Sequence, residues 1–418
     1  MRSQTEAKGL REPGRFLSAV LVFAFAFKLI LAAVAPMSGD EAYFLIWGRH
    51  PDLGFYDHPP MVGWLLALLV MFSDAQWWVR LPAVLASLLV GWGIFRLLRD
   101  VDPERALLAA LLYLLAPVNL LNIIVTTDSA LIVMSFFSAA FLWRAEKTGA
   151  RADYVWAGIF LGLAMLSKYF AALLILAYLV YWASGPRDAV RNRNFLWVFV
   201  SALPFLAVNL YWNSTHCWAN IMFNVFNRHG EAGFALTRPL LYGALLLYLL
   251  TPPLILALWR ARRQPMHPAA RFFALMWGLP YAVFAVLSLV KVIGLHWLLS
   301  FHAFFFLFAA HRLDADTLRR ALRFMVVFTG LHVLAIALFA LLPLETFERW
   351  SKYDGMVLMR RPESILAELV PFEDRYVFAT DGYSTSAILS YHARRGFIVF
   401  GEASSHARHD DIMTDFRT

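Results

Sequence analysis

Long apolar runs alternate with short polar segments along most of this chain. A bilayer-spanning helix needs about 17–25 mostly apolar residues, and only helices or closed barrels satisfy their backbone groups inside the hydrocarbon. We trace eleven candidate spans, near residues 16–36, 79–98, 106–122, 128–143, 153–168, 169–184, 195–212, 237–258, 271–290, 294–310 and 323–343. With 60% hydrophobic residues and a mean hydropathy of +0.60, the chain is too apolar for a soluble globular domain. The pattern predicts an α-helical polytopic membrane protein.

The stretch from 153 to 184 is the ambiguous part of this tracing. Basic residues flank it on both sides, so the chain must cross the membrane there twice or not at all. It is short for two full helices, and Ser167-Lys168-Tyr169 in its middle suits a turn. We therefore expect two short or tilted helices.

The basic residues predict which helix ends face the cytoplasm. The formal net charge of +8 would also suit a nucleic-acid partner, but the cations gather in alternate loops and the intervening loops hold only isolated ones. The clusters are Arg96/Arg99/Arg105, Arg144/Lys147/Arg151, Arg187/Arg191/Arg193, Arg260/Arg262/Arg263/Arg271 and Arg312/Arg319/Arg320/Arg323. This is the positive-inside pattern. We expect a multi-pass protein of the bacterial inner membrane, with a cytoplasmic N-terminus, a periplasmic C-terminus and no nucleic-acid partner.

The first apolar run has a second interpretation as a secretory signal peptide, with Ala33-Val34-Ala35 as the cleavage site. Pro36 at the new N-terminus would disfavour cleavage, and the run is long. We take it as a retained anchor.

Unusual polar residues gather at the non-cytoplasmic ends of these spans. They are Asp40-Glu41, Asp57-His58, Asp128, Lys168, Arg228-His229 and Lys291-His296. Carboxylates beside hydrocarbon are costly, so they are candidates for a functional site. Helix capping is the alternative for Asp40-Glu41 and for Asp128.

The missing motifs narrow the chemistry. The chain has no Walker loop or glycine-rich dinucleotide fingerprint, and its single cysteine, Cys217, allows neither an intramolecular disulfide nor a thiol-ligated metal site. A lipid-phosphate-linked donor fits better, with Asp40 or Glu41 as the base. His58, Lys168, Arg228 or His229 would hold the phosphate. No cluster has metal-ligand spacing, so we name no metal site and no certain cofactor, with a divalent cation as the alternative.

The loops and the tail complete the predicted organisation. A transmembrane catalytic domain spans 1–343. Its first periplasmic loop, 37–78, carries interfacial helices such as 61–72, and a second loop, 213–236, covers the site. The remainder, 344–418, reads as a small or truncated periplasmic α/β domain, with strands at 375–379 and 397–400 around a helix at 384–393.

Four motifs together resemble a known family. They are Gly39-Asp40-Glu41-Ala42-Tyr43, Gly54-Phe55-Tyr56-Asp57-His58-Pro59-Pro60, Thr127-Asp128 and Gly162-Leu163-Ala164-Met165-Leu166-Ser167-Lys168-Tyr169. Over roughly residues 15–310 the chain resembles the polyprenyl-phosphate-dependent glycosyltransferases of the C superfamily. Its nearest group is the bacterial relatives of protein O-mannosyltransferases and of lipid A aminoarabinose transferases.

The resemblance implies a role for each matching residue. Asp40 and Glu41 carry the acidic motif, with Asp40 as base, and Asp128 is the acid of the second outer loop. Tyr43, Tyr56, Lys168, Arg228 and His229 join the donor and phosphate contacts. His58 stands where the aminoarabinose branch has lysine, and a histidine is only partly charged near neutral pH. His296-Trp297-Leu298 stands where many relatives have Asn-Trp-Pro, so His296 is carried over as a weaker match.

The predicted function is transfer of a sugar from a polyprenyl-phosphate donor, of the undecaprenyl type, to an envelope acceptor on the periplasmic face, with inversion. The acceptor is lipid A, lipopolysaccharide core or another glycolipid; a protein hydroxyl is the alternative. The rival of another class is a lipid flippase or secondary transporter. That rival would place its acids near the midplane of repeated halves, whereas here Lys28 is the only firmly mid-span charge.

Overall fold

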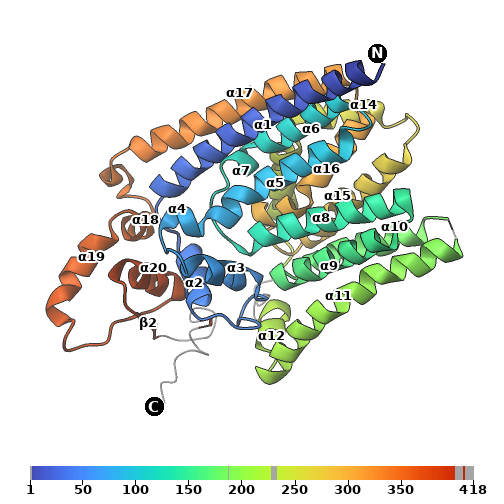
Figure 1. Cartoon of the computed structure of the whole chain (residues 1–418). Helices are drawn as coiled ribbons and strands as arrows, with labels where there is room; N and C mark the ends of the chain where they lie inside the picture. The colour runs from blue at the N-terminus through green and yellow to red at the C-terminus, as the bar shows by residue number, and fades with distance from the viewer. Residues whose placement is uncertain (1, 187, 227–232, 401–407, 410–418) are drawn as a thin grey trace.

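The structure of the chain is a computed structural model, and it describes residues 2–186, 188–226, 233–400 and 408–409. Almost all regular structure in this part is helical (Figure 1). The elements of the bundle are α1 (Arg2–Val34), α2 (Gly39–Arg49), α3 (Met61–Val70), α4 (Gln76–Val79), α5 (Leu81–Leu98), α6 (Pro103–Leu115), α7 (Pro117–Leu120), α8 (Thr127–Thr148), α9 (Arg151–Ser167), α10 (Ala171–Ala183), α11 (Ala189–Thr215), α12 (Ala219–Val225), α13 (Thr237–Leu250), α14 (Pro252–Ala261), α15 (Pro268–Leu287), α16 (Leu295–Arg312) and α17 (Ala315–Leu341). After them come η2 (Leu344–Phe347), α18 (Tyr353–Arg360), α19 (Pro362–Leu369), η3 (Val370–Phe372), β1 (Ala379–Thr380), α20 (Tyr383–Ala393) and β2 (Ile398–Val399).

The chain is a polytopic helical membrane protein. Among the described residues, six helices are long and apolar enough to cross a membrane, and the bent pair α13 and α14 would make a seventh. The count of eleven spans remains a prediction, because several bundle helices are shorter than a bilayer requires. The interruption expected inside 153–184 is present: α9 ends at Ser167, Lys168 follows in extended conformation, and α10 begins at Ala171.

The span predicted over 237–258 is bent in the structure. The helix axis turns by 89° between α13 and α14. Thr251 has a φ of 58°, in the left-handed region, and Pro252 and Pro253 open the second helix. A proline lacks the backbone N–H that a continuing helix would need and disfavours helical conformation in the residue before it. Apolar residues continue on both sides of this break, so hydropathy alone does not reveal the bend.

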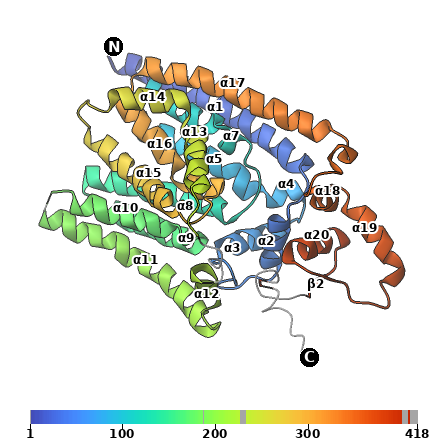
Figure 2. The ribbon, with the colours of Figure 1, turned by 180° about the vertical axis from the view of Figure 1, so that it is seen from behind.

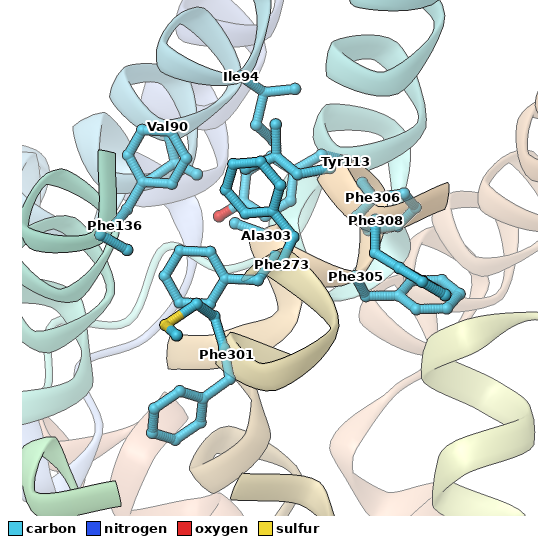
Figure 3. Packing of buried hydrophobic residues seen from close by; sticks show 14 of the residues in the cluster. Val90, Ile94, Tyr113, Phe136, Phe273, Phe301, Ala303, Phe305, Phe306 and Phe308 are labelled. Atoms are coloured by element: carbon cyan, nitrogen blue, oxygen red, sulfur yellow. The ribbon is translucent and has the colours of Figure 1, made fainter. Parts of the chain in front are cut away.

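Helix α16 forms the centre of the bundle. Every residue from Trp297 to Ala310 is buried, as expected for a helix that is apolar on all sides. Its rings interlock with those of the surrounding helices, and Figure 3 shows residues of α16 packed among Tyr113 of α6, Phe136 of α8 and Phe273 of α15. Removing one such ring would cost about 3–5 kcal/mol. The helix is therefore a rigid axis that fixes His296 at one end and Arg312 at the other.

The segment after α17 packs against the first loop of the bundle. Strands β1 and β2 pair in parallel around α20, in the order expected from the sequence. Helix α20 lies against α2 (Figure 1), and the contact is so close that a Cβ on Gly39 would lie 1.6 Å from Ser384 Oγ. Tyr391 donates a hydrogen bond to the carbonyl of Asp74 at 3.0 Å. These contacts bring Tyr383 of α20 to the start of α2.

Candidate active site

A cavity of about 470 Å³ lies where α2, α8, α16 and α17 approach one another. Five residues singled out in the sequence line it: Asp40, His58, Asp128, Lys168 and His296. They come from five separate segments of the chain, so the fold gathers polar groups that the sequence spreads over more than 250 residues. Arg408 joins them from the far end of the chain.

Asp40 is the carboxylate most open to this cavity. It occupies the first turn of α2, where the helix dipole favours an anion, and its residue is exposed. Tyr383 donates a hydrogen bond to Asp40 Oδ1 at 2.8 Å. Burial raises the pKa of the Tyr383 hydroxyl, and the neighbouring carboxylates raise it further, so this hydroxyl keeps its proton. No described residue donates to Oδ2 of Asp40, which is therefore available to a substrate.

Glu41, the adjacent acid, does not line the cavity. It completes a capping box with Ser38 at the start of α2. Its carboxylate forms a two-pronged ion pair with Arg80, Nε to Oε1 and Nη2 to Oε2, both at 2.8 Å. Both side chains are only 1% exposed. The structure thus places Glu41 in a buried structural pair, and its predicted catalytic role is not carried further.

Asp128 and Lys168 form the second charged pair of the cavity. Asp128 lies in the first turn of α8, after the capping residue Thr126. The ammonium of Lys168 contacts both carboxylate oxygens of Asp128, at 2.9 and 2.7 Å. Since Lys168 sits at the break between α9 and α10, the short-helix arrangement is what allows its side chain to reach the cavity. A carboxylate that holds a lysine in this way positions a cation for an anionic ligand.

Asp57 is the centre of a third group of polar and charged side chains, next to the cavity. It is 1% exposed, accepts a hydrogen bond from Tyr43 at 3.3 Å and pairs with Arg408 at 3.1 Å. The guanidinium of Arg408 also lies 3.8 Å from the centre of the Tyr383 ring. Burial alone would lower the pKa of Arg408, but Asp57 and the nearby tyrosines raise it above its usual value. Arg408 therefore brings a permanent charge to the cavity.

His409 anchors this C-terminal contact. Its ring Nδ1 accepts a hydrogen bond from the backbone N–H of Tyr56 at 3.2 Å, and the backbone N–H of His409 donates to the Tyr43 hydroxyl at 2.9 Å. The ring is buried. Burial, with smaller effects of His216 and His50, lowers the pKa of His409 to about 4. The docked ring is consequently neutral at neutral pH.

Acidification is expected to release His409. Its pKa is about 4 when docked and about 6.5 in an open segment, so the open form binds more protons between these values. The contribution of His409 to the free energy of docking is fully present above about pH 6.5 and is lost as the pH falls. At pH 5 docking is roughly 2 kcal/mol less favourable than at neutral pH. Hydrogen exchange at the Tyr56 amide, corrected for the intrinsic rate, should lose protection between pH 7 and 5. The variant His409→Asn should remove this dependence; unchanged protection in the wild-type chain would contradict it.

The loop that carries Asp57 and His58 is held from the side by α11 and α12. Trp212 donates to Asp52 at 2.7 Å, Asn220 to the carbonyl of Phe55 at 2.8 Å and Asn224 to the carbonyl of Asp57 at 2.9 Å. The two asparagine bonds satisfy backbone carbonyls that would otherwise lack partners. Helices α11 and α12 thus fix the position of the Asp57–His58 pair.

Comparison with known proteins shows which sequences and folds this chain is similar to. Residues 57–212 match the family model described as dolichyl-phosphate-mannose-protein mannosyltransferase. A lipid A galacturonosyltransferase, RgtD of Rhizobium johnstonii, is 26% identical over 185 residues, which are 42% of this chain and 38% of that protein. The match therefore spans well under half of this curated relative.

Solved structures extend the likeness to nearly the whole chain. ArnT from Cupriavidus metallidurans in the apo state is 18% identical, with a TM-score of 0.65 over 93% of this chain and 85% of ArnT. The same protein bound to undecaprenyl phosphate gives 17% identity and a TM-score of 0.64, over 93% and 86% of the two chains. The chain has the fold of a C-superfamily glycosyltransferase. The resemblance inferred from its four motifs is confirmed.

Within this C-superfamily fold, the remaining predicted residues do not line the cavity or cannot be placed. Tyr43 is buried and supports Asp57 through its hydroxyl, and Tyr56 packs on Phe223 with ring centres 5.3 Å apart. Arg228 and His229 lie outside the described residues.

Three residues that line or support the candidate site were not predicted from the sequence. Arg80 lies at the start of a predicted span, and Tyr383 and Arg408 follow the last one. The position of Arg80 at the edge of a predicted apolar span was a usable signal, because a buried cation needs a partner. Nothing in the local sequence marks Tyr383 or Arg408, since both act through contacts more than 300 positions away.

The described acidic and histidine side chains at the cavity do not converge on a metal site. In the described part of the chain, no group of three or more His, Cys, Asp or Glu side chains converges as metal ligands would. Asp57 and His58 approach to 4.0 Å, but Arg408 occupies the Asp57 oxygen that faces His58. These residues do not fit a bound divalent cation in this arrangement, and we derive no step through one.

Proposed function

We propose that the protein is a membrane glycosyltransferase that moves a sugar from a polyprenyl-phosphate donor to an envelope glycolipid. The observation that carries this proposal is the cavity in which Asp40, an open carboxylate, shares one space with Lys168 and Arg408. A carboxylate suits proton abstraction from a hydroxyl, and the cations suit the phosphate that departs. The likeness to the fold of ArnT, which has also been solved bound to undecaprenyl phosphate, supports the donor class.

The transfer is a single displacement. Asp40 accepts the proton of the acceptor hydroxyl as its oxygen forms a bond to the anomeric carbon of the sugar. The bond from that carbon to the donor phosphate oxygen breaks, and its electron pair leaves with polyprenyl phosphate. His58, Lys168 and Arg408 hold the resulting anion, and Asp128 keeps Lys168 in place. Attack opposite the leaving group inverts the anomeric configuration.

The lining of the cavity suits an amphiphilic donor. Its polar groups are joined by apolar side chains of α16 and α17, including Leu295, Leu299 and Ile336, with Tyr248 of α13. We assign this side to the first isoprene units of the lipid. The positive-inside pattern puts this end of the bundle at the periplasmic face of the inner membrane. The donor would then enter from the outer leaflet, with its chain remaining in the bilayer.

Lipid A or a related glycolipid is the acceptor that the relatives favour. RgtD is named as a lipid A galacturonosyltransferase. The matching family model is named for transfer to protein, which makes a secreted protein hydroxyl the second candidate. The identity of the transferred sugar is left to experiment.

The test uses the full chain purified into nanodiscs. It is incubated with a panel of polyprenyl-phosphate sugars and with lipid A, and both polyprenyl phosphate and glycosylated lipid A are measured by mass spectrometry. Formation of both products in equal amounts supports the proposal. A peptide rich in serine and threonine replaces lipid A in a parallel reaction and identifies protein transfer.

The same preparation tests the transport alternative. Reconstituted vesicles carrying a fluorescent polyprenyl-phosphate sugar report movement of the intact lipid between leaflets. Lipid movement without bond cleavage, for every donor of the panel, would refute the glycosyltransferase proposal and favour a flippase.

A further inference from the structure

A second cavity, of about 690 Å³, lies at the other end of the bundle. It is formed by α14, the end of α16 and the start of α17. His296 lines the candidate active site and Arg312 lines this cavity, and sixteen residues of α16 separate them, which is about 24 Å of helix. Figure 2 shows α14 at the same end of the molecule as the N-terminus. The two cavities therefore lie at opposite ends of the helical bundle.

The second cavity is strongly basic. Four arginines and one carboxylate line it: Arg105, Arg260, Arg312, Arg320 and Asp314. The carboxylate is already engaged, because Asp314 caps α17 by accepting a hydrogen bond from the Thr317 N–H at 2.7 Å. The balance of charge leaves room for an anion.

Arg312 supplies a fixed cation at the base of this cavity. Its guanidinium donates to the carbonyls of Pro265 at 2.8 Å and Gln264 at 3.2 Å, and to that of Ala261. These bonds immobilise the side chain without neutralising it, since no described carboxylate pairs with Arg312. Arg260 likewise has no carboxylate partner in the described part of the chain, and Arg320 donates only to the Thr317 hydroxyl at 2.8 Å.

The shape of the charge distribution matches an amphiphile. Pro253, Leu256, Ala257 and Arg260 line the cavity with the spacing that puts residues on one face of α14. The apolar residues occupy its first turns and the arginine its last. On α17, Ala321 follows Arg320 into the lining. A free inorganic anion would use only the charged end of this groove.

Topology alone explains the presence of arginines at this surface, but not their arrangement. The positive-inside rule predicts basic residues in the cytoplasmic loops but does not predict that their side chains line one cavity. Arg319, on the same turn of α17 as Arg320, is paired with Glu104 and Asp316 and lies outside the cavity. Of the arginines that line the cavity, Arg260, Arg312 and Arg320 have no carboxylate salt bridge among the described residues, whereas Arg105 is paired with Asp102.

We propose that this second cavity binds the phosphate headgroup of an anionic phospholipid in the leaflet opposite the candidate active site. Arg260, Arg312 and Arg320 hold the phosphate, and an acyl chain lies along the apolar turns of α14. Basic pockets between membrane helices at the cytoplasmic surface recognise anionic headgroups by this chemistry. The proposal concerns a binding site and does not depend on the glycosyltransferase activity.

Native mass spectrometry of the full chain in detergent tests the proposal. The protein is titrated with phosphatidylglycerol, with phosphatidylcholine and with inorganic phosphate. We expect phosphatidylglycerol to bind at least tenfold more tightly than phosphatidylcholine. The double variant Arg260→Gln/Arg320→Gln should lose about fivefold in affinity for each charge removed, or about 25-fold in total.

The matched control removes the same charge from the same helix ends. Arg263 and Arg323 are exposed and do not line the cavity, so Arg263→Gln/Arg323→Gln should change the affinity less than threefold. Equal losses in the two double variants would overturn the proposal in favour of diffuse surface charge. Equal binding of the two lipids would also overturn it. Displacement of phosphatidylglycerol by millimolar phosphate would identify a free-anion site instead. The charge-conserving pair Arg260→Lys/Arg320→Lys, which is expected to bind, guards against a folding defect.

Discussion

Asp40→Asn is expected to lower kcat for sugar transfer by about 10²–10⁴, the range that a positioned general base contributes. The amide has nearly the shape of the carboxylate and still accepts the hydrogen bond that Tyr383 donates to Oδ1. It cannot accept the proton of the acceptor hydroxyl, so the acceptor oxygen must attack without being deprotonated. The rate of polyprenyl phosphate release, at saturating donor and acceptor, measures this effect directly.

The Asp40→Asn substitution should lower kcat and leave the KM for the donor unchanged. In the proposed arrangement Asp40 acts on the acceptor, and the donor phosphate is held by His58, Lys168 and Arg408. A group that acts only in the transition state lowers kcat and kcat/KM equally. A rise in donor KM with unchanged kcat would instead place Asp40 in donor binding.

Asp381→Asn is the matched control for Asp40→Asn. Asp381 is an exposed carboxylate two residues before Tyr383 and does not line the cavity. Its variant should keep activity within twofold of the wild type. If Asp40→Asn were as active as this control, the base would have to be sought elsewhere, first at Asp128, the other carboxylate in the cavity lining.

Much of the site could be predicted because the orientation of each membrane span depends on the charged residues of the loops next to it. The positive-inside rule assigns each helix end to a face without knowledge of packing. Polar residues at the alternate ends, such as Asp128 and Lys168, must then lie at one surface. The structure brings these two into direct contact at 2.7 Å, although no sequence pattern indicates that they pair.

The division of labour between Asp40 and Glu41 could not be predicted. Neighbouring residues on a helix point about 100° apart, so one acid faces the cavity and the other faces the bundle. Which acid does which depends on where Arg80 lies, and that is set by the packing of α5 against α1. Only the fold reveals that Glu41 is enclosed.

The C-terminal contribution lay beyond sequence reasoning for a different reason. Tyr383 reaches the site because α20 packs on α2, with a close approach at Gly39. Arg408 is held there by Asp57 and the Tyr383 ring. Long-range contacts of this kind leave no periodic pattern in either segment. The Thr251-Pro252-Pro253 break, by contrast, carried a readable signal, which the continuous apolar run outweighed.

Arg80→Met is expected to give the largest loss of stability among single changes at the site. The substitution leaves Glu41 charged, 1% exposed and without its cation, and removes the donor that serves the carbonyls of Ala32, Ala35 and Pro36 at 2.8 Å each. Breaking a buried ion pair from one side costs roughly 3–5 kcal/mol. Thermal unfolding in detergent, followed by tryptophan fluorescence, should show a clearly lowered Tm.

Two further variants separate the ion pair from general damage. Arg49→Gln breaks a partly exposed pair with Asp74, 3.0 Å long, and should cost only about 0–1 kcal/mol. In the double variant Glu41→Gln/Arg80→Met no buried charge is stranded, so it should be more stable than Arg80→Met alone. If Arg80→Met unfolded no earlier than Arg49→Gln, the Glu41–Arg80 pair would not be what holds α2 to the bundle. A double variant less stable than either single change would mean that the carbonyl contacts of Arg80 matter more than its charge.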